Sequence, residues 1–117
     1  MKKAFKLLSK RTIEKIEDLG FSVELESDGF YRFGRYSSAG QDFSFYVDIG
    51  ETMSDFAYNI LNYHDNFDPI EEAYLWLDDS GHGKNGAPYD MRDVYDDMKE
   101  CKGFIYELYE FIIKEFC

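Results

Sequence analysis

The chain has 117 residues, with 24 acidic and 13 basic residues, a formal net charge of −11 at pH 7, and 44% hydrophobic and 19% aromatic residues. This length suffices for one domain whose core needs no disulfide or metal, and the aromatic content is too high for a disordered acidic tail. The negative charge argues against nucleic acid as a ligand, because each bound phosphate is normally neutralised by a Lys or Arg.

The first predicted element is an amphipathic helix from about Phe5 to Leu19. Leu8, Ile13 and Ile16 recur at helical spacing, and Gly20 follows as a stop signal. The outer face of this helix is basic. Residues 1–36 contain eight basic and six acidic residues, whereas residues 37–117 contain five basic and eighteen acidic ones. The acidity therefore belongs to the second part of the chain.

After Gly20 the hydrophobic period changes from about 3.6 to 2, which is typical of strands. Apolar residues alternate with polar ones over residues 21–25 and again over 43–49, and Asp28-Gly29 is a hairpin turn signal before a strand over 30–36. The pattern predicts a three-stranded antiparallel meander within one domain, residues 1–117.

Helix signals follow from residue 51 onward. Thr52 with Asp55 resembles a capping box, and Asp68-Pro69 places an N-cap acid before a proline at the first helical position. We expect a helix after Thr52 and a short helix that ends near Leu77. Together with a long final helix, these elements predict an α+β fold.

The final helix is predicted from about Met91 to Phe116, after a polar, glycine-rich loop over residues 78–87. One apolar stripe marks its core face: Met91, Val94, Met98, Cys101, Ile105, Leu108, Ile112 and Phe116. A carboxylate ridge is expected on roughly the opposite side: Asp93, Asp96, Asp97, Glu100 and Glu107.

Two patterns imitate ligand sites but lack an essential part. Residues 81–86 match G-x-G-x-x-G, but they follow a predicted helix where a dinucleotide site needs a strand. Asp78, Ser80 and His82 imitate the start of a calcium loop whose twelfth residue is Tyr89 in place of Glu. Neither histidine has a Cys or His at zinc-ligand spacing. We predict no metal and no cofactor.

The chain also lacks a recognisable nucleophile or an informative pair of carboxylates, so we expect no enzyme activity. Cys101 lies on the apolar stripe and is read as a small hydrophobic residue. No signal-peptide pattern follows Met1, and no apolar stretch could cross a bilayer, so a soluble cytoplasmic protein with Cys101 and Cys117 as thiols is expected.

The acidic ridge has two interpretations. It is either a solvated face that keeps the protein soluble, or a surface that copies the charge of a nucleic-acid backbone and enters a basic groove. Phe104 and Phe111 fall on the same side, either as exposed contact residues or as residues of a helix buried on both sides. Trp76 is either a lid on the core or a contact residue.

The second half of the chain resembles a group of small uncharacterised proteins. The residues that carry the resemblance are Phe67-Asp68-Pro69, Glu71-Glu72, Trp76, Gly81, Gly86-Ala87-Pro88, Arg92-Asp93 and Asp96. They are similar to proteins of phages and mobile elements in gut Firmicutes, over residues 67–116. The resemblance implies a mobile element, where small acidic proteins often act against host defence. In charge and size the chain is also similar to anti-CRISPR and anti-restriction proteins that mimic DNA.

These observations predict a non-catalytic acidic inhibitor that binds the basic nucleic-acid groove of a host-defence nuclease. The partner is expected to be a basic protein, with no direct binding of nucleic acid or membrane. The predicted partner-binding residues are Trp76, Asp78, Asp79, Asp93, Asp96, Asp97, Glu100, Phe104, Glu107 and Phe111. The alternatives are an immunity protein or antitoxin that neutralises a cationic nuclease, and an interaction protein of a mobile element whose acidity serves solubility alone.

Overall fold

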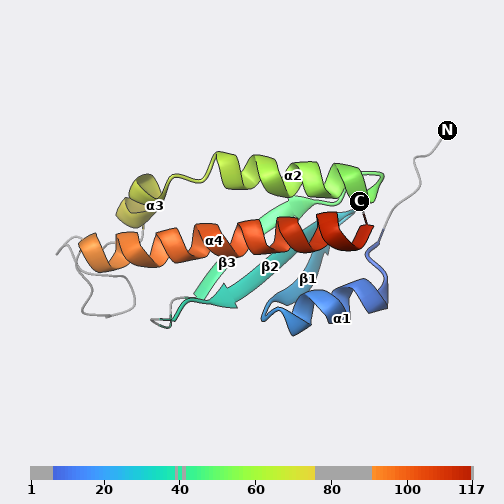
Figure 1. The fold of residues 1–117 in the computed structure, drawn as a ribbon, viewed down its shortest axis with the longest axis horizontal. Coiled ribbons are helices and arrows are strands. Elements are labelled where there is room, and N and C mark those ends of the chain that lie inside the picture. The colour runs from blue at the N-terminus through green and yellow to red at the C-terminus, as the bar shows by residue number, and fades with distance from the viewer. Residues whose placement is uncertain (1–6, 39, 41, 76–90, 117) are drawn as a thin grey trace.

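The computed structural model describes residues 7–38, 40, 42–75 and 91–116, and their helices and strands confirm the predicted α+β fold (Figure 1). In chain order the elements are α1 (Lys10–Asp18), β1 (Ser22–Ser27), β2 (Phe30–Tyr36), β3 (Asp42–Asp48), α2 (Met53–Asp65), α3 (Pro69–Leu75) and α4 (Met91–Phe116).

The three strands form an antiparallel meander in the order β1-β2-β3. Gly29 has a φ of +69° in the turn between β1 and β2, a conformation that glycine adopts without steric cost, and this confirms the Asp28-Gly29 turn. Phe33 of β2 pairs with Val23 of β1 and with Phe45 of β3. Odd-numbered residues therefore share one face of the sheet and even-numbered residues the other, up to the register shift after Leu25 of β1.

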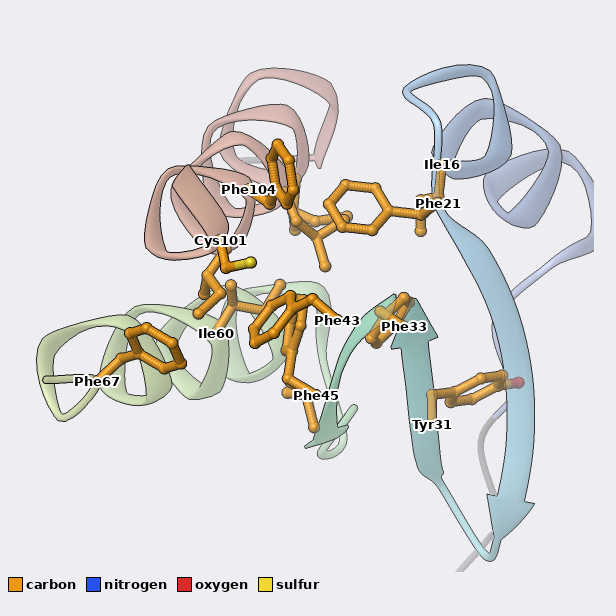
Figure 2. Close-up of a cluster of buried hydrophobic side chains, with 14 of the residues drawn as sticks. Ile16, Phe21, Tyr31, Phe33, Phe43, Phe45, Ile60, Phe67, Cys101 and Phe104 are labelled. Atoms are coloured by element: carbon orange, nitrogen blue, oxygen red, sulfur yellow. The ribbon is translucent and has the colours of Figure 1, made fainter. Parts of the chain in front are cut away.

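The helices α1, α2 and α4 lie on one side of the sheet, so the described residues form two layers (Figure 1). Phe33 and Phe45 point from the inner sheet face toward the helices, where Phe56 and Ile60 of α2 and Cys101 of α4 are fully buried (Figure 2). The Phe33 ring stacks on Phe56 with centroids 5.9 Å apart, and burial of such rings supplies the largest share of the apolar stabilisation.

The long helix α4 begins and ends at the predicted residues. Six members of its predicted stripe are fully buried: Val94, Met98, Cys101, Ile105, Leu108 and Ile112. Phe116, at the last turn, is exposed instead. The 3.6-residue period of apolar residues predicted the core face of α4 correctly, because this face is buried along nearly the whole helix.

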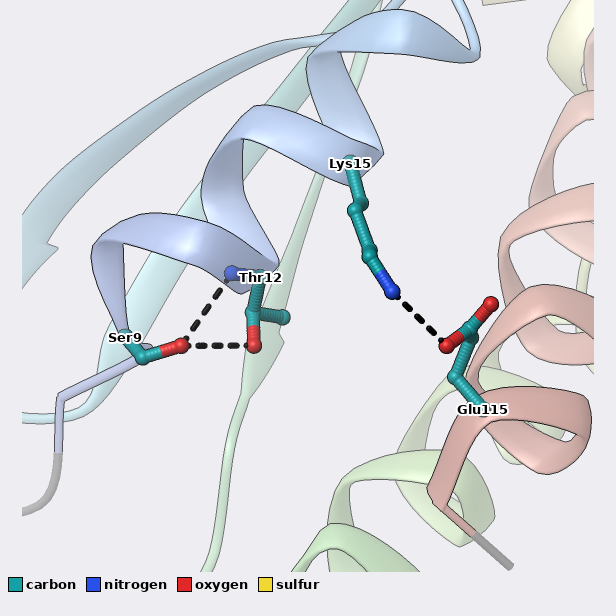
Figure 3. Close-up of polar contacts among 4 residues, drawn as sticks. All are labelled: Ser9, Thr12, Lys15 and Glu115. Carbon is teal, nitrogen blue, oxygen red and sulfur yellow. Dashed lines mark hydrogen bonds and ion pairs between the residues drawn. The ribbon is translucent and has the colours of Figure 1, made fainter.

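Helix α1 is shorter than predicted, because it starts at Lys10 and not near Phe5. Ser9 is its N-cap: the Ser9 hydroxyl oxygen accepts a hydrogen bond from the Thr12 N–H at 3.1 Å (Figure 3). Leu8 is buried although it precedes the helix, and its N–H donates to the Tyr31 hydroxyl at 3.0 Å. The helical spacing of apolar residues thus extends to Leu8, before the helix begins, and only the Ser9 cap marks where the helix starts.

The predicted capping box at the start of α2 is confirmed. The Thr52 hydroxyl accepts from the Asp55 N–H at 3.0 Å, and the Asp55 carboxylate accepts from the Thr52 N–H at 3.3 Å. Before α3 the Asp68 carboxylate accepts from the Ile70 N–H at 2.9 Å. Within α3 the Ile70 side chain is exposed, whereas Ala73 is fully buried.

Strand β1 only partly follows its hydrophobic alternation. Val23 packs against the core, but Leu25, on the same face, is 46% exposed. The pairing with β2 shifts register between Leu25 and Ser27, and β1 is an edge strand, so little covers its far end.

Candidate interaction surfaces

Three of the predicted partner-binding residues lie outside the described residues: Trp76, Asp78 and Asp79. The glycine-rich pattern of residues 81–86 and the calcium-like pattern that starts at Asp78 lie there too. Asp93 is in the first turn of α4, but its side chain is outside the described part of the structure. The role of these residues stays a prediction.

Asp97 does not belong to an exposed ridge, which corrects the prediction. Its side chain is only 6% exposed. Asp97 follows Val94 and precedes Cys101 by one helical turn each, and both of those residues are fully buried. The buried face of α4 is wider than one stripe because α2 and α3 both pack against the helix.

Phe104 and Glu107, predicted to be contact residues, are engaged inside the molecule. The Arg35 guanidinium of β2 lies over the Phe104 ring, 4.1 Å from its centroid, and Arg35 Nη1 donates to Glu107 Oε2 at 3.1 Å. Phe104 is 6% exposed. Phe21, which precedes β1, lies on the side of α4 from which Phe104 projects (Figure 2). Of the two interpretations of Phe104, burial of the helix on both sides is therefore correct.

Glu100 is held by the segment that follows β2. The Ser38 N–H donates to Glu100 Oε2 at 3.0 Å, and the Ser38 hydroxyl donates to Oε1 at 2.6 Å. Two hydrogen bonds to one carboxylate fix that side chain against the loop. Hydrogen bonds to an ionised acceptor are stronger than neutral ones.

A third carboxylate of α4 continues this row. Glu115 Oε2 accepts from the Lys15 ammonium of α1 at 3.0 Å (Figure 3). We name these three contacts the docking seam: Glu100, Glu107 and Glu115 of α4 with Ser38, Arg35 and Lys15. The acids are seven and eight residues apart, which is about two helical turns, so they share one side of α4. Part of the predicted ridge thus joins the weakly basic part of the chain to the acidic helix.

The other two predicted residues differ from each other. Asp96 is exposed, and its carboxylate lies 3.5 Å from the Lys99 ammonium. Phe111 is half-buried and packs against the core cluster, with the Phe116 ring 6.5 Å away edge to face. Asp96 therefore remains available to a partner, whereas most of Phe111 serves the fold.

The sequence reasoning missed a larger surface, the outer face of the sheet. No described helix covers this face, because α1, α2 and α4 lie on the other side (Figure 1). Its residues are Ser22 and Glu24 of β1, Phe30, Arg32, Gly34 and Tyr36 of β2, and Asp42, Ser44, Tyr46 and Asp48 of β3.

Aromatic rings and carboxylates are mixed on this outer sheet face. The Phe30 and Tyr46 rings stack with centroids 5.7 Å apart, and Tyr36 is also exposed. The Arg32 guanidinium lies 3.6 Å from the Glu24 carboxylate. Exposed aromatic residues surrounded by charge are typical of protein interaction surfaces.

At one end of the outer sheet face lies an open recess of about 290 Å³, which we name the end recess. It is lined by Glu17, Gly20, Phe21, Ser22, Gly34, Arg35, Tyr36 and Asp42. Within the described chain neither the Glu17 nor the Asp42 carboxylate has a hydrogen bond or an ion pair. The recess therefore combines two carboxylates with an exposed tyrosine ring.

Burial raises the pKa of described ionisable groups that pack in or against the core. Burial, together with the nearby carboxylates of Asp97, Glu100 and Glu72, raises the pKa of the Cys101 thiol to about 12. A thiol with so high a pKa is a poor nucleophile at neutral pH. Burial also raises the pKa of Glu72, to which the charge of Glu71 adds. Among the described residues, no three His, Cys, Asp or Glu side chains are grouped as metal ligands would be.

None of the described helices is both long and apolar enough to cross a membrane. The chain matches no family model, no curated protein and no solved structure. The resemblance of residues 67–116 to proteins of mobile elements therefore stays a prediction, as does the cytoplasmic location.

Proposed function

We propose that this protein is a non-catalytic acidic inhibitor that binds the basic nucleic-acid groove of a host-defence nuclease, in the manner of an anti-CRISPR protein. One observation carries the proposal. Residues 42–75 contain no Lys or Arg, and seven of their eight carboxylates are exposed: Asp42, Asp48, Glu51, Asp55, Asp65, Asp68 and Glu71. This stretch covers β3, α2 and α3 with charge of one sign.

Some of these carboxylates also have local structural roles. Asp48 accepts a hydrogen bond from the Gly50 N–H at 2.7 Å, and Asp55 and Asp68 cap helices. Such hydrogen bonds leave the negative charge in place, because the donors are neutral N–H groups. A surface of one sign attracts a basic groove over about 8–10 Å and speeds association at physiological salt.

The structure changes which residues the proposal uses. Glu107 is paired with the Arg35 guanidinium and Asp97 is buried, so these two contribute little to a partner surface, whereas Glu100 accepts from neutral donors and keeps its charge. The exposed acids of β3, α2 and α3 replace those two, and Asp96 is retained. Mimicry of a phosphate backbone would then use carboxylates from three elements in place of one helix.

An immunity protein or antitoxin would use the same acidic surface against a cationic nuclease toxin. The two roles differ in the enzyme that is inhibited and not in the physics of the contact. The charge of residues 42–75 supports both roles equally. Inhibition assays against different classes of nuclease therefore decide between them.

The test is an inhibition assay with purified enzymes: an RNA-guided nuclease loaded with its guide, a restriction endonuclease and a cationic nuclease toxin. We expect inhibition of one enzyme, competition with its nucleic acid, and an affinity that falls steeply between about 50 and 200 mM salt. An affinity that is flat over this range would contradict the mimicry, and inhibition of none would contradict the inhibitor role.

A matched pair of variants separates the acidic surface from net charge. Asp65→Asn with Glu71→Gln removes two exposed carboxylates from the stretch 42–75, whereas Glu14→Gln with Asp18→Asn removes two from α1. Both variants change the net charge by the same amount. We expect the first variant to weaken binding about tenfold and the second to change it less than about twofold. Equal losses would contradict a role for residues 42–75.

A further inference from the structure

The end recess offers three features at once to a cationic side chain. Two carboxylates, of Glu17 and Asp42, line it, and the exposed Tyr36 ring forms part of its wall. Its lining also includes Ser22 and Gly34, paired neighbours on β1 and β2 with small side chains. A built Cβ on Gly34 would lie 2.8 Å from the Ser22 hydroxyl, so the Ser22 side chain lies directly over the glycine.

Two described guanidinium groups lie at the recess, and each has a carboxylate partner. Arg35 is among the lining residues, and Arg32 Nη1, which would lie 3.7 Å from a Cβ built on Gly34, is 3.6 Å from Glu24 Oε1. The Arg35 guanidinium is bonded to the Glu107 carboxylate at 3.1 Å and stacked on the Phe104 ring at 4.1 Å. Its charge is therefore compensated from the helix side. Glu17 and Asp42 have no such partner among the described residues, so their charges act on the recess itself.

We infer that the end recess receives an arginine side chain of the basic partner, which anchors that partner on the outer sheet face. This inference rests on the proposed function, because it assumes a partner with a basic surface. A guanidinium is planar, so it can stack on the Tyr36 ring while it donates to the carboxylates of Glu17 and Asp42. A lysine ammonium would gain the attraction between charges without the stacked, forked geometry.

The exposed rings of the outer sheet face extend the contact. Tyr46 lies opposite Arg32 in the strand register, Phe30 lies two residues farther along β2, and the two rings are already ordered by stacking. Ordered rings lose little conformational entropy on binding, so they suit a flat partner surface.

The test uses deca-arginine and deca-lysine as probes, with two pairs of matched variants. Tyr36→Ala is compared with Tyr58→Ala, because each tyrosine is 68% exposed and Tyr58 lies on α2, away from the recess. Glu17→Gln is compared with Glu110→Gln, since both residues are exposed helical glutamates. Circular dichroism melts verify that all four variants are folded.

We expect deca-arginine to bind the wild-type protein about threefold or more tighter than deca-lysine. Tyr36→Ala and Glu17→Gln should remove that preference, whereas Tyr58→Ala and Glu110→Gln should keep it. In an amide NMR titration the largest shifts should fall at Ser22, Gly34 and Tyr36. Equal affinity for both peptides, equal effects of the paired variants, or shifts centred on α2 or α4 would each overturn the inference.

The same variants distinguish this inference from the proposed function. If a nuclease is inhibited and the double variant Glu17→Gln, Tyr36→Ala inhibits as strongly as the wild type, the inhibitor role stands and the recess is not the anchor. If no nuclease is inhibited but deca-arginine maps to the recess with the expected preference, the recess stands as an arginine site and the inhibitor role fails.

Discussion

The Arg35 guanidinium lies 4.1 Å from the centroid of the Phe104 ring, and the Phe21 ring is 5.4 Å away from the same group. Arg35, near the end of β2, thus contacts the Phe104 ring in the middle of α4 and the Phe21 ring just before β1. Its ion pair with Glu107 adds direction to this contact, but the pair is partly exposed and worth little alone. The rings supply most of the stabilisation.

Phe104→Ala should lower the free energy of unfolding by about 3–4 kcal/mol, because it removes a buried ring and leaves a cavity below Arg35. Urea denaturation monitored by circular dichroism measures the change. Phe111→Ala is the control on the same side of α4, and its half-buried ring should cost clearly less. A loss for Phe104→Ala below about 1 kcal/mol would indicate an exposed ring and contradict the described packing.

Glu100→Gln should loosen the segment after β2, because the Ser38 N–H and hydroxyl lose a charged acceptor. The expected loss of stability is about 1 kcal/mol, with faster hydrogen exchange at the Ser38 amide. Glu110→Gln, an exposed change on the same helix, should alter neither quantity. Unchanged exchange at Ser38 in Glu100→Gln would show that this hydrogen bond does not hold the loop.

The stability of the protein should fall in alkaline solution because of Cys101. The pKa of its thiol is about 12 in the folded protein against an ordinary value of 9.0, so the unfolded chain loses this proton first. Its contribution is fully present below pH 9 and is lost as the pH rises toward 12. The loss amounts to about 1.4 kcal/mol per pH unit within this window.

Denaturation curves at several pH values measure this effect. The Cys101→Ala variant should be less stable at neutral pH but should lose stability less steeply above pH 9, since its remaining alkaline titrations are those of the wild type. Parallel curves for the two proteins would show that the thiol is not protected in the fold.

Two glycines should respond to alanine in opposite directions. Gly103 lies within α4, and a methyl group there would meet no described atom within 4 Å, so Gly103→Ala should stabilise the protein by about 0.5–1 kcal/mol. Gly50 has a φ of +65°, and a built Cβ would lie 2.6 Å from the Asp55 Cβ, so Gly50→Ala should destabilise it by more than about 1 kcal/mol. Thermal melts of both variants test the pair, and changes of the same sign would contradict it.

The sequence predicted the elements that carry strong local signals. The 26-residue helix α4 has an uninterrupted apolar period, and α2 has a complete capping box. The start of α1 was wrong, because an apolar residue buried by Tyr31 prolonged the helical pattern past the Ser9 cap. Local patterns therefore located the helices more reliably than their ends.

The candidate site was harder to predict, because periodicity on one helix does not reveal what packs against its second side. The spacing of Glu100 and Glu107 on α4 predicts an exposed ridge. Their partners, Ser38 and Arg35, lie more than sixty residues earlier in the chain, so the sequence pattern of the helix does not reveal these contacts. One signal could have indicated this: the basic excess of residues 1–36 complements the acidic excess of the rest. Opposite charge on two parts of one chain favours their contact as much as contact with a partner.

The docking seam also constrains the order in which the chain can fold. Its three contacts join residues 62, 72 and 100 positions apart, so each closes a long loop. Contacts between distant residues form slowly, because the entropy of loop closure is lost before they stabilise anything. During synthesis α1, the meander and α2 emerge before α4, so Phe33 and Phe45 can contact α2 first and lack the cover of α4 until that helix leaves the ribosome. We expect a chaperone that binds exposed apolar side chains to act in that interval.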